Sequence, residues 1–294
     1  MRVLIASLAV VAATLGLAQQ HPGRATSLNP PPELAKSMDW AALSAGVALP
    51  KPATNAQRLA RGLPLIKPKT PRRHSHRRGP YRRGSRVLAA PRAEPSPEPP
   101  VSKQCNIAVT SSPAGDQVGL LAAAFNRFGE YGAVVSTTNP NPLVVSFSYS
   151  LDSLDQLDLT AVNGPSAAQP FFGTAVGYAS SSNDMSSTSS NYVIVVGTTQ
   201  TPPGSPPSDE ADNTFSQTTS IPVAAESAVW VYDPVTQALN IRWVNTDGTP
   251  VDLSILLCEQ TDNDFLVATG NPALFTSTFG ANCPAVTLTC VPPV

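Results

Sequence analysis

Short runs of alternating apolar and polar residues fill the C-terminal two thirds of the chain. Between Leu143 and Tyr149 every second residue is apolar, so Leu143, Val145, Phe147 and Tyr149 share one face of a predicted strand. The same patterns predict strands at 117–121, 133–137, 157–162, 172–178, 191–196, 228–232, 239–244, 251–257, 264–268 and 286–290. One helical turn is expected at 272–279.

Turn-forming residues separate the strands at 228–257. Asp233-Pro234 opens the first connection and Asp247-Gly248 lies in the second, so this stretch is predicted to be a meander. The Ser/Thr-rich segments 179–190 and 198–220 are predicted surface loops. Short strands with Gly, Pro and Asn between them indicate an all-β fold, and we expect a single sandwich or jelly-roll-like domain over residues 104–294.

The first residues have the pattern of a secretory signal. Arg2 precedes a short apolar run, and Gly16 and Ala18 put small residues three positions and one position before a cut. We expect a signal peptide over residues 1–18, cleaved after Ala18, and no membrane association afterwards. The expected localisation is therefore secreted, or extracellular.

Residues 19–103 have the composition of a disordered pro-segment. They contain 15 of the 31 prolines but only two of the 18 aromatic residues, so they offer little apolar surface to bury. The pairs Arg72-Arg73, Arg77-Arg78 and Arg82-Arg83 fall within this segment. A dibasic processing protease is therefore an expected partner, with cuts after Arg73, Arg78 and Arg83.

The net charge of −1 is a cancellation between two oppositely charged parts. Residues 51–92 carry 13 Lys and Arg and no acid, whereas residues 104–294 carry 16 acids against two arginines. Basic runs are typical of nucleic-acid binding, but secretion makes nucleic acid an unexpected partner. A released cationic peptide from residues 51–86 is an alternative role for the basic run.

Four cysteines lie in the predicted domain: Cys105, Cys258, Cys283 and Cys290. An even number of cysteines in an exported chain indicates two disulfides, with three possible pairings. Their spacing of 152, 24 and 6 intervening residues matches no zinc pattern, so we expect no metal and no cofactor.

All three histidines, His21, His74 and His76, precede Cys105. If the pro-segment is removed, the domain has no imidazole to act as a base or to bind zinc or copper. No catalytic residue is assigned. The carboxylates offer an alternative, because a glycosidase needs only two of them. The candidates are Asp152, Asp155, Asp158, Glu226, Asp252, Glu259, Asp262 and Asp264.

Two short features admit a binding role and a structural one. Residues 245–248 and 262–264 faintly resemble calcium loops, but neither continues with the glutamate of an EF-hand, so turns are the better interpretation. Trp230 and Trp243 lie on neighbouring predicted strands. Exposed, they would stack on sugar rings; their apolar neighbours favour burial in the core.

Three motifs resemble a family of secreted proteins of mushroom-forming (basidiomycete) fungi. Residues 54–64, which read Asn-Ala-Gln-Arg-Leu-Ala-Arg-Gly-Leu-Pro after Thr54, are similar to that family's pro-region. Phe128-Gly129-Glu130-Tyr131-Gly132 and the stretch 226–248 are similar to its β-rich C-terminal domain. The resemblance covers most of residues 50–294. It implies a fungal extracellular protein and transfers no catalytic residue.

The function expected from these observations is a non-enzymatic extracellular domain that associates with wall or environmental polysaccharide after the pro-segment is removed. The alternatives are a carboxylate-based glycoside hydrolase and the precursor of a cationic peptide.

Overall fold

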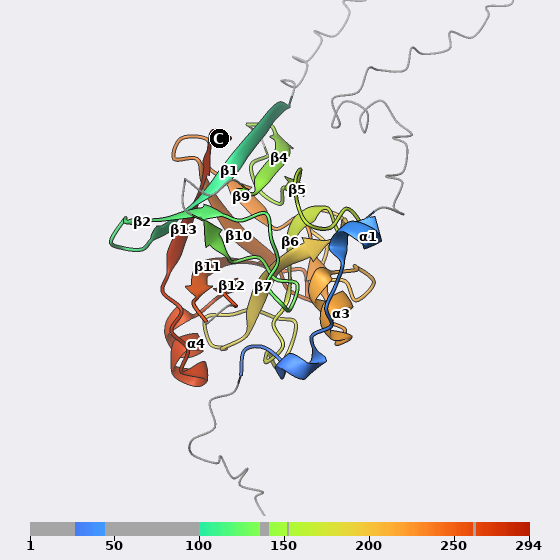
Figure 1. Cartoon of the computed structure of the whole chain (residues 1–294). Helices are drawn as coiled ribbons and strands as arrows, with labels where there is room; N and C mark the ends of the chain where they lie inside the picture. Colours follow the sequence, from blue (N-terminus) through green and yellow to red (C-terminus); the bar gives the residue numbers. More distant parts are fainter. Residues whose placement is uncertain (1–26, 45–99, 136–140, 152, 261–262) are drawn as a thin grey trace, which may run out of the picture.

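The computed structural model describes residues 27–44, 100–135, 141–151, 153–260 and 263–294. Thirteen strands in this part of the chain belong to one sheet (Figure 1). The first seven are β1 Val101–Ser111, β2 Gln117–Leu121, β3 Val134–Val135, β4 Val144–Tyr149, β5 Thr160–Ala161, β6 Phe171–Val176 and β7 Tyr192–Thr198. The others are β8 Ala225–Glu226, β9 Trp230–Tyr232, β10 Ala238–Val244, β11 Pro250–Cys258, β12 Phe265–Thr269 and β13 Val286–Val291.

The sheet closes on itself as an antiparallel barrel. Neighbouring strands follow the order β13-β10-β11-β12-β7-β6-β5-β4-β1, and β1 also pairs with β13, which makes a ring of nine. The all-β prediction is confirmed. We expected a sandwich or jelly-roll, and the structure instead has one continuous closed sheet, because the first and last strands of the domain pair along six residues from Asn106 to Ser111. Closure removes the exposed edges of those two strands.

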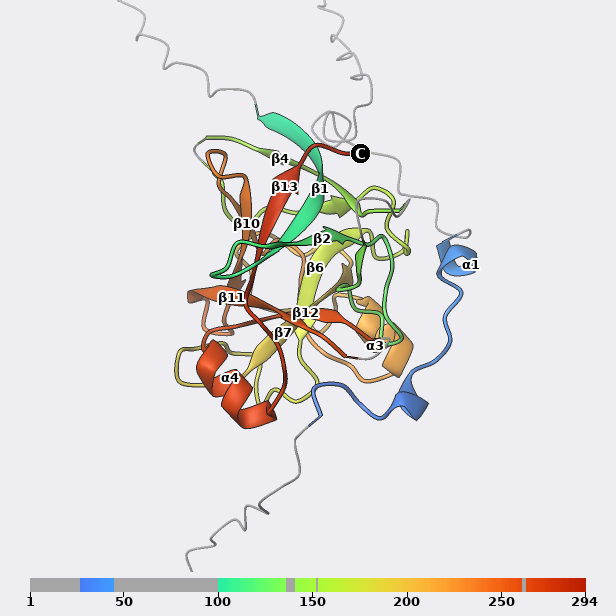
Figure 2. The same ribbon diagram turned by 60° about the vertical axis from the view of Figure 1, so that its left-hand side comes forward.

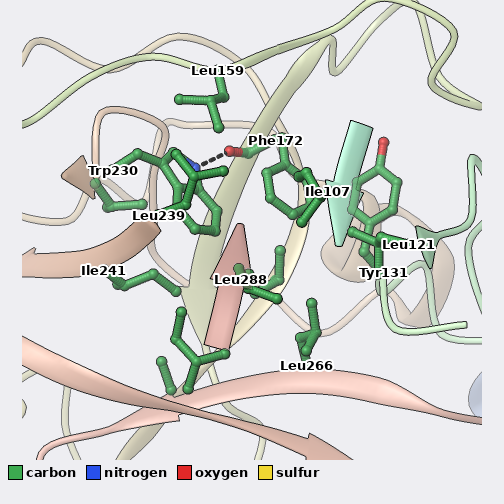
Figure 3. Packing of buried hydrophobic residues seen from close by; sticks show 14 of the residues in the cluster. Ile107, Leu121, Tyr131, Leu159, Phe172, Trp230, Leu239, Ile241, Leu266 and Leu288 are labelled. Atoms are coloured by element: carbon green, nitrogen blue, oxygen red, sulfur yellow. Dashed lines mark hydrogen bonds between the residues drawn. The ribbon is translucent and has the colours of Figure 1, made fainter. Parts of the chain in front are cut away.

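Alternation along each strand separates a core inside the barrel from a second core outside it. On β13, Val286, Leu288 and Cys290 point inward and the residues between them face outward. The inner core includes Ile107, Phe172, Trp230 and other large side chains, which interdigitate in Figure 3. This is the two-residue period from which the strands were predicted.

The second core covers the outer face of β7, β11 and β12. Tyr192, Ile194 and Val196 of β7 pack there, while Val193 and Val195 face the barrel interior. Both faces of β7 and β12 are buried, which explains why these strands are continuous apolar runs. The cover includes Phe215, and Phe275 and Phe279 from a C-terminal helix.

Four short helical segments of the described residues lie outside the barrel wall. They are η1 Pro32–Leu34, α1 Trp40–Ser44, α3 Thr214–Thr219 and α4 Pro272–Phe279. Helix α4 has the predicted bounds, and Asn271 caps it by accepting a hydrogen bond from Leu274 N at 3.0 Å. Helix α3 was not predicted: residues 198–220 were expected to be a surface loop, but Phe215 packs in the outer core. Figure 2 shows α3 and α4 at separate places on the barrel.

The predicted strands are found within a few residues of their expected positions, and the meander of β9, β10 and β11 is confirmed. Strand β1 was not predicted, and its first three residues precede the predicted start of the domain at residue 104. Its first residues include the polar Ser102, Lys103 and Gln104, which do not show the apolar alternation of a strand. They pair with β4 at the rim of the barrel, where polar side chains reach water.

Two disulfides form, as predicted, and the fold selects one pairing. Cys105 on β1 bonds to Cys290 on β13, so this bridge lies at the junction that closes the barrel. Cys258 bonds to Cys283 in the outer core, between the end of β11 and the segment after α4. No helix in the described residues is long and apolar enough to cross a membrane.

Residues 27–44 belong to the segment whose composition predicts disorder, yet they lie against the barrel. Leu28 and Asn29 are each 3% exposed, and Lys36 N donates to Thr218 O at 3.0 Å. Figures 1 and 2 both show this blue segment running beside α3. Composition underestimated its order because its few apolar groups bind to a surface made elsewhere. Ala18, Arg73, Arg78 and Arg83 lie outside the described residues.

Candidate functional site

A groove lies between the N-terminal segment and the loop that follows β2. It encloses about 540 Å³, and its lining includes Lys36 and Trp40 from the segment and Phe125, Asn126 and Arg127 from the loop. The rings of Trp40 and Phe125 meet edge to face with centroids 5.1 Å apart. The groove therefore combines aromatic surface, an amide and two cationic side chains.

The loop is held in shape by its own hydrogen bonds. Asn126 Oδ1 accepts from Phe128 N at 2.9 Å and from Glu130 N at 3.1 Å. Between them Gly129 has φ of +81°, a conformation that glycine adopts without strain. Thr214 Oγ1 on α3 donates to Gly129 O, which fixes the loop to the barrel wall. These contacts point the Glu130 side chain toward the N-terminal segment.

Glu130, at the end of this loop, is a fully buried carboxyl group. Its Oε2 accepts from Asn126 Nδ2 at 2.7 Å and from Asn29 Nδ2 at 3.0 Å. Burial raises the pKa of Glu130 to about 7, and the two amide donors oppose that shift. Neither Glu130 Oε1 nor Asn29 Oδ1 has a hydrogen-bond partner among the described residues. The group is poised to take up or release a proton near neutral pH.

A second buried carboxyl group, Glu226, lies on the opposite face of the sheet. Its neighbour Ala225 packs in the outer core, so Glu226 points inward, whereas Tyr131 packs in the inner core and Glu130 points outward. Val244 N donates to both Glu226 oxygens at 3.3 Å. Burial raises the pKa of Glu226 to about 9, so it is protonated at pH 7. The barrel wall separates the two groups.

Asp158 takes part in a third polar cluster. Ser227 Oγ donates to Asp158 Oδ1 at 2.6 Å, and Gln200 Nε2 donates to Asp158 Oδ2 at 2.7 Å. Burial raises the pKa of Asp158, and these two hydrogen bonds lower it. Thr201 N also donates to Ser227 Oγ at 2.8 Å, so the serine is tied into the backbone. The cluster links three separate segments of the chain, and the Asp158 carboxyl is the ionisable group within it.

Among the remaining described carboxylate candidates, Asp155 and Asp252 are brought together, but through the guanidinium group of Arg242. Arg242 bridges Asp155 at 2.9 Å and Asp252 at 2.7 Å on the outside of the barrel. Glu259 is exposed, and Asp264 Oδ1 accepts from Gln260 N at 3.0 Å. Asp152 and Asp262 lie outside the described residues.

The two faint calcium motifs behave differently in the structure. Asp247 Oδ1 accepts from Thr249 N at 2.8 Å, which lowers the pKa of Asp247 and makes this motif a turn. In the other, Asp262 is not described. No group of three or more His, Cys, Asp or Glu side chains suited to a metal occurs within the described ranges.

Trp230 and Trp243 are core residues. Both are fully buried, and Trp230 stacks on Phe172 with ring centroids 4.8 Å apart. The Trp230 indole N–H donates to Phe172 O, as Figure 3 shows, and Trp243 Nε1 donates to Asn183 O at 2.9 Å. These two rings are therefore not available to stack on a sugar.

A smaller hollow of about 300 Å³ lies beside the Ser/Thr-rich loop 179–190. Tyr178, which is 39% exposed, lines it together with Ser181 and Asp209. It lacks the cations and the paired rings of the larger groove, so the larger groove is the stronger candidate.

Glu130 was not among the carboxylates that the sequence singled out. Its signal was an acidic residue enclosed by aromatic residues and glycines, in Phe128-Gly129-Glu130-Tyr131-Gly132. Comparison with protein-family models, curated proteins and solved structures finds no match for this chain.

Proposed function

We propose that this chain is a secreted fungal protein whose barrel is a non-enzymatic extracellular domain that associates with wall or environmental polysaccharide. The signal-like first 18 residues and the two disulfides support export. The motifs at 54–64, 128–132 and 226–248 support the fungal family.

The observation that carries the proposal is the groove beside residues 125–127. Sugar rings present both C–H faces and hydroxyl groups, so a site for them needs aromatic surface next to fixed hydrogen-bonding groups. Trp40 and Phe125 provide the aromatic surface, while Arg127 and Lys36 provide two cationic donors. The aromatic residues of this site differ from the two considered from the sequence, since Trp230 and Trp243 are buried.

The placement of the acids supports binding rather than hydrolysis. A glycosidase needs two carboxyl groups across one open space. Glu130 and Glu226 point to opposite faces of the barrel wall, and Asp155 and Asp252 are both held by Arg242. Among the described residues, no two candidate carboxyl groups both line the groove.

Retention on insoluble polysaccharide tests the proposal. The secreted full chain is incubated with β-glucan, chitin and cellulose particles, and the bound fraction is measured after washing. We expect retention on at least one of them, and a fall of about tenfold or more in Arg127→Ala and Trp40→Ala. Val235→Ser is the matched control, because Val235 is 88% exposed in the turn between β9 and β10, outside the groove lining.

Two results would contradict the proposal. One is the absence of retention on all three polysaccharides. The other is retention that Arg127→Ala and Trp40→Ala leave unchanged, which would place binding elsewhere on the surface.

The glycoside hydrolase alternative keeps one supporting observation, the pKa of about 7 at Glu130, which suits a general acid. It predicts release of soluble sugar from the same particles at acid pH, abolished by Glu130→Gln. If sugar release is unchanged in Glu130→Gln, Glu226→Gln and Glu259→Gln, these residues are excluded as catalytic acids. If no sugar is released at all, the glycoside hydrolase class is excluded.

A further inference from the structure

The N-terminal segment contacts the barrel as a bound ligand does, through a few buried anchors. Leu28 is 3% exposed within the outer core, next to Phe128, Tyr192 and Phe215. Tyr192 Oη donates to Leu28 O at 2.6 Å in the same buried region. A backbone carbonyl and an apolar side chain of one residue are therefore both recognised.

Asn29 adds a second anchor next to the first. It is 3% exposed and donates from Nδ2 to the buried Oε2 of Glu130 at 3.0 Å. Removing the segment would take one hydrogen bond from this carboxyl oxygen, which keeps Asn126 Nδ2, and one from the Tyr192 hydroxyl, which keeps Ala179 N. Buried hydrogen bonds of this kind are costly to break, since each leaves a polar group to be solvated again.

Further along, the contacts become those of an interface rim. Lys36 N donates to Thr218 O at 3.0 Å, Lys36 Nζ donates to Ser220 Oγ, and Trp40 meets Phe125. The segment thus spans from the outer core to the groove, along α3. All three dibasic pairs occur between residue 45 and residue 99, outside the described residues.

We propose that residues 27–44 stay bound to the barrel after the chain is cut between residues 44 and 101, so that the processed protein is a two-chain complex with no covalent link between its parts. The partner of this surface is the chain's own N-terminal fragment, and the groove survives processing because both of its walls remain.

Burial of Glu130 against the segment makes this binding dependent on pH. With the segment bound, burial holds the pKa of Glu130 at about 7, and desolvation is the largest cause. Without it, water reaches Oε2 and the pKa moves toward the ordinary value of 4.5. The bound state therefore prefers the protonated acid, so binding is tightest in acid and weakens as the pH rises from about 5 to 7, by up to about tenfold per pH unit.

The groups around Glu130 do not reverse this sign. Tyr192 on β7 faces it, and burial raises the pKa of the Tyr192 hydroxyl far above neutrality, so it stays uncharged. Asn126 on its own loop and Asn29 on the segment are neutral amides, and their hydrogen bonds lower the pKa of Glu130 by less than burial raises it. Lys36 on the segment donates to Ser220 on the far side of α3's last turn. Arg127 lines the groove next to Trp40.

The experiment uses the full secreted chain with one site-specific protease sequence in place of residues 76–79. After complete cleavage the sample is passed over a size-exclusion column at pH 5 and at pH 8, and the barrel peak is analysed by mass spectrometry. We expect the N-terminal fragment to elute with the barrel at pH 5 and to be lost to a larger extent at pH 8. Elution of the fragment apart from the barrel at both pH values would overturn the proposal.

Three variants assign the cause. Asn29→Ala changes the fragment and not the barrel, and we expect it to release the fragment at pH 5. Glu33→Gln, an exposed residue of the same segment, is the matched control and should keep it. Glu130→Gln should make retention the same at both pH values. If Asn29→Ala retains the fragment as the wild type does, Asn29 is not an anchor. If retention of the wild-type fragment does not vary with pH, the role proposed for Glu130 is wrong.

Discussion

Glu130 and Glu226 lie where water does not reach them, and each depends on hydrogen bonds from backbone or amide donors. Neither is paired with a cation in the described residues, so burial decides their protonation. In the folded protein both acids hold their protons to a higher pH than they do in the unfolded chain. Folding therefore becomes less favourable as the pH rises from the pKa of each acid in the unfolded chain to its pKa in the folded protein.

Glu226→Gln tests this at one position. Its contribution to stability is fully present below the unfolded pKa of about 4.5 and is lost as the pH rises toward about 9. Glutamine has the same shape and no charge, so the variant should match wild type near pH 4.5 and exceed it by roughly 3 kcal/mol at pH 7. Urea unfolding at several pH values measures the difference.

Glu210→Gln, at an exposed glutamate, is the control for that experiment and should show no such change. Equal pH profiles for wild type and Glu226→Gln would contradict the burial of an uncompensated acid in the barrel.

Gly132 is required for a close approach between two backbone segments. A Cβ at this position would lie 2.1 Å from Phe265 Cα on β12, so neither segment can yield without moving its backbone. We expect Gly132→Ala to lower the free energy of unfolding by about 3 kcal/mol or more. Gly248→Ala is the control: its φ of +85° disfavours alanine, but nothing lies within 4 Å, so the loss should be about 1 kcal/mol. Equal losses would refute the steric argument.

At the scale of elements, the helices and the N-terminal segment are present because one side of the barrel is too apolar to face water. Outward residues of β7 and β12 such as Ile194 and Val267 need a cover, and α4 provides Phe275 and Phe279. Burial of this apolar surface, rather than helix propensity, stabilises so short a helix.

Asn271 fixes α4 in two ways. Its Oδ1 accepts from Leu274 N at 3.0 Å, and its Nδ2 donates to Ser187 O at 2.6 Å. Asn271→Ala should lower the free energy of unfolding by about 1 to 2 kcal/mol, because both hydrogen bonds are lost. Asn271→Asp keeps the cap and loses only the contact with Ser187, so its loss should be smaller. Thermal unfolding with matched protein concentrations compares them, and an equal loss in both would show that the cap contributes little.

At the scale of the whole molecule, closing the barrel joins the two ends of the domain. Strands β1 and β13 are far apart in sequence, and Cys105–Cys290 encloses 185 residues, against 25 for Cys258–Cys283. A crosslink that closes a longer loop restricts the unfolded chain more. The bridge at the β1–β13 junction should therefore be the more stabilising of the two.

Removing each bridge as a pair of alanines tests this. We expect a loss of about 5 kcal/mol for Cys105→Ala with Cys290→Ala and about 3 kcal/mol for Cys258→Ala with Cys283→Ala, measured by guanidinium unfolding. A larger loss for the second pair would mean that local packing around α4, and not barrel closure, limits stability.

Much of the architecture follows from local patterns in the sequence. The β-rich class, most strand positions, the bounds of α4 and the burial of Trp230 and Trp243 were all predictable, since alternation and apolar neighbours are properties of adjacent residues. Strand β1 was not predicted although Cys105, Ile107 and Val109 alternate into the inner core, since the residues before them are polar. Helix α3 was not predicted because it lies in a Ser/Thr-rich segment without an apolar period. Glu130 escaped because its burial depends on Asn29, about one hundred residues away.

The sequence by itself therefore determined most of the strands, helix α4, the presence of two disulfides, and the histidine-free, acidic character of the domain. Only the tertiary structure decided that the sheet closes as a barrel, which cysteines pair, and that residues 27–44 bind over a buried acid. The reason is the range of the forces involved. Side-chain alternation is fixed within a few residues, whereas closure, pairing and burial arise only when distant segments meet.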